Sequence, residues 1–209
     1  MKLGTLALLL LVALVQPSWS PAAQQTGASA ESPALTTRLA LRDLWVEHIF
    51  WVRNYAVANQ TGQRQQAEVA ATQVVDNAKA IAGSIAPLYG QPAADQLLKL
   101  LAGHWGAIKG YSDATLAKND AGKKAAVAEL TSNAKAIAKF LSDANPNLPE
   151  DALVSMLGAH GGHHVAQIDQ LAKGGFAGEA MTWQAMRKHM LVLADTLGAA
   201  LVKQFPDKF

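Results

Sequence analysis

The side chains that could bind a metal ion are concentrated in the C-terminal third of the sequence. Four of the six histidines lie there, together with every methionine except Met1. The candidate ligands in this region are His160, His164, His189, Met156, Met186 and Met190. Imidazole nitrogen suits copper, zinc, iron and nickel, whereas thioether sulfur favours copper and above all Cu(I). The combination predicts a mixed nitrogen and sulfur site for a copper ion, with zinc as the alternative metal.

The spacing of these residues predicts how they are carried. Met156, His160 and His164 recur at intervals of four, so on a helix they lie along one face and His160 and His164 can chelate one ion. Met186, His189 and Met190 form a second group on a later helix. His163 is expected to face solvent.

A 56-residue internal repeat organises the chain. The segment NAKAIA at 77–82 recurs at 133–138, and the same offset relates His48, His104 and His160. Apolar residues recur at three- and four-residue spacing within each unit, which is typical of amphipathic helices. We therefore predict an all-α protein of three antiparallel helical hairpins, six helices in total, packed as a helical bundle. The hairpins span roughly 36–88, 92–145 and 149–205, with turns near 62, 118 and 174, and no strand is expected.

Hairpin geometry predicts which residues face each other, because residues equally far from a turn lie at the same height. The pairs are His48 with Asn77, His104 with Asn133, and His160 with His189. Two interpretations follow. Either the imidazoles converge on a metal ion, or each histidine is hydrogen-bonded by its asparagine in a buried polar core that only fixes the packing. Because the third hairpin has histidine in place of asparagine, we expect the metal site there, centred on His160 and His189.

Other functions are less well supported by the sequence. A helical bundle can bind haem b through axial histidine or methionine, and this is a third possibility. The chain lacks cysteine, and with it the C-x-x-C-H motif of covalent haem attachment. It also lacks E-x-x-H, H-E-x-x-H, G-x-S-x-G and nucleotide-binding glycine motifs. The sequence therefore favours metal handling, or a structural and interaction module, over catalysis.

Composition bounds the remaining choices. The chain has 209 residues, of which 50% are hydrophobic and 16% charged, so it can build a folded core. A net charge of +2 gives no reason to expect a nucleic acid partner, and no motif identifies a protein partner. One domain over 35–209 is expected.

The N-terminus resembles an export signal. Lys2 precedes an apolar run over 3–15, which is too short to span a bilayer, and Ser20 and Ala22 are small residues suited to a cleavage site. We interpret 1–22 as a signal peptide and 23–34 as a flexible leader. The protein is then expected in the periplasm or outside the cell, with no membrane span after the signal is removed.

Three segments resemble a known family. They are LRDLWVEH at 41–48, FLSDANPN at 140–147 and KQFPDKF at 203–209. They are similar to a family of exported bacterial all-helical proteins that end in a QFPxKF-like tail. The resemblance covers essentially the whole chain after the signal peptide. It implies a secreted all-α protein and does not imply a particular activity.

The export hypothesis predicts the N-terminus of the mature protein. Cleavage after Ala22 leaves a product that begins at Ala23, because the small residues at positions 20 and 22 fit the signal peptidase. N-terminal sequencing of the protein from its native cells checks this. A product that begins at Met1 would contradict it.

Overall fold

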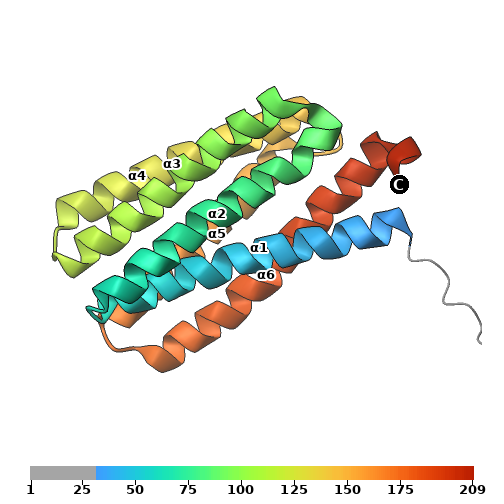
Figure 1. The fold of residues 1–209 in the computed structure, drawn as a ribbon. Helices are drawn as coiled ribbons and strands as arrows, with labels where there is room; N and C mark the ends of the chain where they lie inside the picture. Colours follow the sequence, from blue (N-terminus) through green and yellow to red (C-terminus); the bar gives the residue numbers. More distant parts are fainter. Residues whose placement is uncertain (1–31) are drawn as a thin grey trace, which may run out of the picture. The chain divides into compact units, whose positions relative to one another are not determined.

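The computed structural model, which describes residues 32–209, consists of six α-helices and a final turn of 3₁₀ helix (Figure 1). The elements are α1 (Pro33–Gln60), α2 (Arg64–Tyr89), α3 (Gln91–Leu116), α4 (Asp120–Ala144), α5 (Glu150–Ala172), α6 (Phe176–Gln204) and η1 (Pro206–Lys208). No strand occurs in this part of the chain. The prediction of an all-α bundle is confirmed. The proposed signal peptide, 1–22, and most of the leader lie outside the described residues.

The breaks between helices fall where the sequence predicted them. Short turns at 61–63, 117–119 and 173–175 divide each hairpin, and Gly90 and residues 145–149 separate the hairpins. The first helix begins earlier than expected, so residues 33 and 34 are helical and do not belong to a flexible leader. The reason is local: the Ser32 hydroxyl accepts a hydrogen bond from the Leu35 N–H at 3.3 Å, and Pro33 occupies the first helical position, where its missing N–H costs nothing.

The repeat determines how the helices pack. The first helix of each hairpin, α1, α3 and α5, contacts both of the others, and these three form an inner set. The second helices lie outside them: α2 packs against α1 and α3, α4 against α3 and α5, and α6 against α5 and α1. The last helix therefore closes a ring on the first, and α1 and α6 lie side by side (Figure 1).

The inner helices present equivalent residues to the core at each level. Their buried positions alternate by four and three residues, which is the spacing of a continuous apolar stripe. The successive sets, each related by the 56-residue offset, are Leu41, Leu97 and Leu153; Trp45, Leu101 and Leu157; His48, His104 and His160; and Val52, Ile108 and His164. A level of three histidines thus lies in the interior of the bundle, between an apolar level and a level of two aliphatic residues and His164.

Polar contacts connect the hairpins around this core. The Tyr55 hydroxyl donates to Asp113 at 2.9 Å, and the equivalent Tyr111 hydroxyl donates to Asp169 at 3.0 Å. The ring is closed between α1 and α6 by an ion pair of Arg53 with Glu179 at 2.6 Å. These contacts hold the three hairpins at a common height, so the histidines stay level with one another. No helix within 32–209 has the length and apolar character that crossing a membrane requires.

The single-residue link between α2 and α3 predicts a stability difference between two glycines. Gly90 has φ 85° and ψ 164°, a conformation that only glycine adopts readily, so Gly90→Ala should lower the free energy of unfolding by about 1–3 kcal/mol. Gly83 is exposed within α2, and a Cβ there meets no atom within 4 Å. Gly83→Ala should therefore raise the free energy of unfolding by about 0.5–1 kcal/mol. Urea unfolding of both variants measures this; equal effects would contradict the role given to Gly90.

Candidate metal centre

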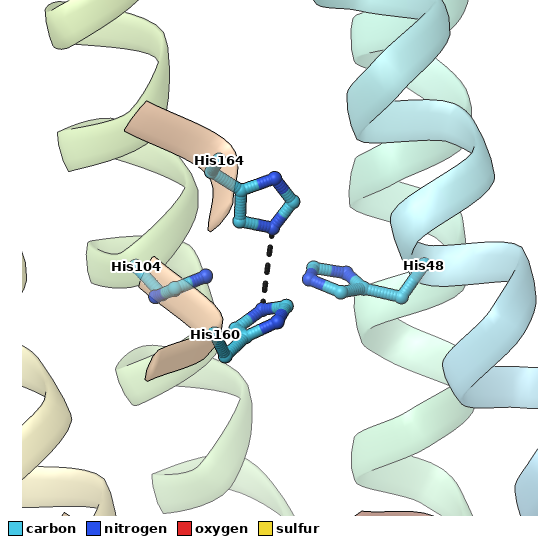
Figure 2. Close-up of side chains that lie close together, drawn as sticks. All are labelled: His48, His104, His160 and His164. Carbon is cyan, nitrogen blue, oxygen red and sulfur yellow. Dashed lines mark hydrogen bonds between the residues drawn. The ribbon is translucent and has the colours of Figure 1, made fainter. Parts of the chain in front are cut away.

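Four histidines converge in the interior of the bundle (Figure 2). His48 comes from α1, His104 from α3, and His160 and His164 from α5. One ring nitrogen of each lies within 4.8 Å of those of the other three. All four side chains are buried, with exposed fractions between 2% and 6%. Within residues 32–209, this group of possible metal ligands consists of histidines and includes no carboxylate.

Three of the rings form a triangle and the fourth lies beside it. The ring centroids of His48, His104 and His160 are 5.3–5.9 Å apart, as expected for equivalent residues of three helices around one axis. His164 comes one turn later on α5, and its centroid is 4.5 Å from that of His160. The repeat explains why the set has four members and not three, because His164 replaces the aliphatic residue found at this level in the other two hairpins.

Four of the eight ring nitrogens of this cluster are buried without a hydrogen-bond partner. Both ring nitrogens of His48, Nε2 of His104 and Nδ1 of His160 are buried and unpaired. The one hydrogen bond inside the cluster joins Nε2 of His160 to Nε2 of His164 at 3.2 Å. A buried polar group without a partner costs roughly 1–3 kcal/mol, so the cluster destabilises the metal-free bundle. A bound cation would offset this by accepting several of these nitrogen lone pairs.

Burial keeps the four imidazoles neutral. Desolvation, assisted by the nearby His104, lowers the pKa of His48 to about 3, and desolvation lowers that of His104 to about 4. The pKa values of His160 and His164 lie well below the ordinary value, again chiefly because both rings are buried and then because the other histidines surround them. Neutral imidazole is the form that binds metals. The four rings are therefore ready to bind at physiological pH without first releasing a proton.

The dimensions suit a small four-coordinate ion. Metal–nitrogen bonds of about 2.0–2.1 Å place the nitrogens of a tetrahedral site about 3.3 Å apart. The 3.2 Å between Nε2 of His160 and Nε2 of His164 already matches such an edge. The remaining separations, up to 4.8 Å, would close by small rotations of the rings. The cluster could therefore hold one metal ion.

The structure moves the centre of the predicted site. His48, His104, His160 and His164 come together, but His189 is not part of the cluster. Its Nε2 lies 2.9 Å from the main-chain oxygen of Met156, so the expected centre on His160 and His189 is displaced to the four-histidine group.

The predicted methionine ligands lie in the hydrophobic core. Met186 and Met190 are completely buried within the cluster of apolar residues that includes Leu193 and Ala194, and Met156 packs against its edge. The packing of these side chains follows from their apolar character, because thioether groups fill irregular gaps in a core.

Of the two interpretations left open by the sequence, the one with a hydrogen bond between each histidine and its asparagine is wrong. Asn77 donates to the main-chain oxygen of Leu44 at 3.0 Å, and Asn133 donates to that of Leu100 at 2.9 Å. The bond of His189 to Met156 is the third member of this set, since all three span 33 residues and occupy equivalent places. The asparagines thus fix the hairpins through the main chain and leave the histidines free of them.

No protein-family model, curated protein or solved structure matches the chain. The function must therefore be inferred from the geometry and chemistry of the cluster. Haem gains no support from that geometry. The centroids of the four rings all lie within 6.0 Å of one another, an arrangement that suits a single ion better than a macrocycle.

The depressed pKa values predict that the metal-free protein loses stability in mild acid. The unfolded chain binds protons at histidine below about pH 6.5, whereas the folded cluster binds them only near pH 4 or lower. The unfolded state therefore holds more protons in this range, and the free energy of unfolding falls as pH falls, by roughly 1.4 kcal/mol per pH unit for each fully differing histidine.

Urea unfolding of the metal-free protein between about pH 7 and about pH 5 measures this slope. His104→Leu, which places in the cluster the residue type of the neighbouring level, should reduce the slope by one histidine's share. A slope that is unchanged in this variant would show that the titrating groups lie elsewhere.

Proposed function

We propose that the protein is an exported copper-binding protein that holds one Cu(I) ion between His48, His104, His160 and His164. The observation that carries the proposal is the convergence of four buried, neutral imidazoles, with four of their eight ring nitrogens unpaired, on one point. Replacing these residues by leucine would give an ordinary core, so their presence needs a compensating ligand. A metal ion supplies one.

The charge of the cluster favours a monovalent ion. The four ligands are neutral and the grouping includes no carboxylate, so the full charge of the ion would be retained in the core. The cost of burying a charge rises steeply with its magnitude, which favours Cu(I) over a divalent ion such as Zn²⁺. Imidazole ligation alone accepts either metal, so the preference for Cu(I) comes from its lower charge and not from methionine ligands.

The closed coordination favours binding over catalysis. A catalytic metal site keeps a position open for water or substrate, whereas four protein ligands fill a tetrahedral shell. All four rings are also buried, with exposed fractions between 2% and 6%. The proposed role is therefore storage or transfer of the ion.

The proposed location rests on the sequence. The signal-like residues 1–22 and the resemblance to exported all-helical proteins both support export. Export would also explain the absence of cysteine from a copper protein, because thiols are oxidised outside the cytosol and imidazole ligands are not.

Anaerobic titration with Cu(I) against a chromogenic chelator tests the proposal. Wild type should bind about one ion per chain, and saturation should raise the melting temperature, since a ligand that binds only the folded state stabilises it. His160→Leu should weaken binding by at least about 100-fold, because removing a direct ligand costs more than the 10–100-fold typical of an outer-shell partner.

Met190→Leu is the matched control, as it preserves core volume and removes a thioether. Its affinity should equal that of wild type, and X-ray absorption should show nitrogen neighbours only. A sulfur atom bound to the copper ion would instead support the mixed nitrogen and sulfur site predicted from the sequence. If neither Cu(I) nor Zn²⁺ binds and melting is unchanged, the histidines serve packing alone.

A further inference from the structure

A second pair of histidines lies beside the cluster. The rings of His163 on α5 and His189 on α6 have centroids 5.6 Å apart and planes inclined by 40°. Both side chains are half-buried, whereas those of the cluster are fully buried, so the pair lies between the cluster and the surface. His163 had been expected to face solvent, but its Nδ1 is buried and has no hydrogen-bond partner.

The hydrogen bond of His189 identifies its free nitrogen. Nε2 lies 2.9 Å from the main-chain oxygen of Met156, and a carbonyl oxygen only accepts. Nε2 therefore carries the proton, and in the neutral ring Nδ1 has the lone pair. A histidine whose outer nitrogen donates to a main-chain carbonyl is the arrangement that orients imidazole for a metal.

The repeat separates the structural role of this position from an additional one. Asn77 and Asn133 make the same main-chain hydrogen bond in the first two hairpins. The bond therefore does not require histidine, and what His189 adds is a nitrogen ligand. At the positions equivalent to His163, the other hairpins carry Trp51 and Ala107. Both members of the pair are thus specific to the third hairpin.

The pair shares a helix segment with the cluster. His163 follows His160 by three residues and precedes His164, so it shares their turn of α5. The charge of His189 contributes to lowering the pKa of His160, and that of His163 contributes to lowering the pKa of His164, as expected for neighbouring rings. An ion held by the pair would therefore lie on the same turn of α5 that carries His160 and His164.

We propose that His163 and His189 form a loading site that captures Cu(I) at the protein surface and passes it to the four-histidine cluster. The inference rests on the proposed function. The transfer exchanges one neutral imidazole for another, so the ion keeps its charge and no proton is released. Without the pair, the ion would have to wait for the helices to separate before it reached the enclosed rings.

The rate of Cu(I) uptake tests this proposal. Anaerobic stopped-flow mixing with Cu(I) should show uptake slowed roughly tenfold or more in a His163→Gln, His189→Asn double variant, because loading then depends on local opening. The equilibrium affinity should stay within about threefold of wild type, since the four final ligands are intact. Asparagine at 189 keeps the hydrogen bond to Met156, as Asn77 and Asn133 do. Met181→Leu, which removes an exposed thioether from α6, should load at the wild-type rate.

A second arm detects the loading site directly. In His160→Leu, which lacks the complete cluster, weak Cu(I) binding should remain and should disappear when His189→Asn is added. Unchanged uptake in the double variant, or an equal loss of affinity and rate, would overturn the loading site while leaving Cu(I) binding by the cluster intact. Absence of equilibrium binding in wild type would instead reject the proposed function itself.

Discussion

The burial of three equivalent imidazoles at one level of the bundle is the constraint on which the other features depend. His48, His104 and His160 occupy positions where the neighbouring levels, apart from His164, carry leucine, tryptophan, valine or isoleucine. Four of their six ring nitrogens have no hydrogen-bond partner, and the asparagines that could have bonded to them donate to the main chain instead. The bundle must therefore be stable enough to carry this cost, and the long regular helices above and below the histidine level provide the apolar burial that offsets it.

The architecture could be predicted from the sequence because its signals are local and repeated. NAKAIA at 77–82 and 133–138 establishes the period, and Gly90 and Pro146 mark the boundaries between units. The start of α1 was misplaced because the Ser32 cap and Pro33 lie at the edge of a polar segment that resembles a linker in composition. Such an end depends on one hydrogen bond, which composition does not reveal.

The site was harder to predict for a geometric reason. The distance of a residue from the hairpin turn gives its level along the bundle, but it does not give the direction of its side chain. Equal distance from the turn correctly placed Asn77 opposite the turn of α1 that carries His48. It did not show that the amide would bond to the main chain one turn away while the ring turned inward. The convergence of His48 and His104 with His160 required the inner helices to meet, which depends on packing between hairpins. The offset of 56 nevertheless contained the clue to His164, since Val52 and Ile108 are its equivalents and are typical core residues.

The three-hairpin ring has a consequence for coordination number. Three identical hairpins around an axis would contribute ligands in multiples of three, so a tetrahedral shell could not be completed by protein side chains of a symmetric trimer. Joining the hairpins in one chain removes that restriction, because each copy can then change by itself. The substitution at 164 uses this freedom: one hairpin contributes two nitrogens and the others one each. Departure from symmetry is thus what lets a scaffold of three similar hairpins offer four nitrogens to one point.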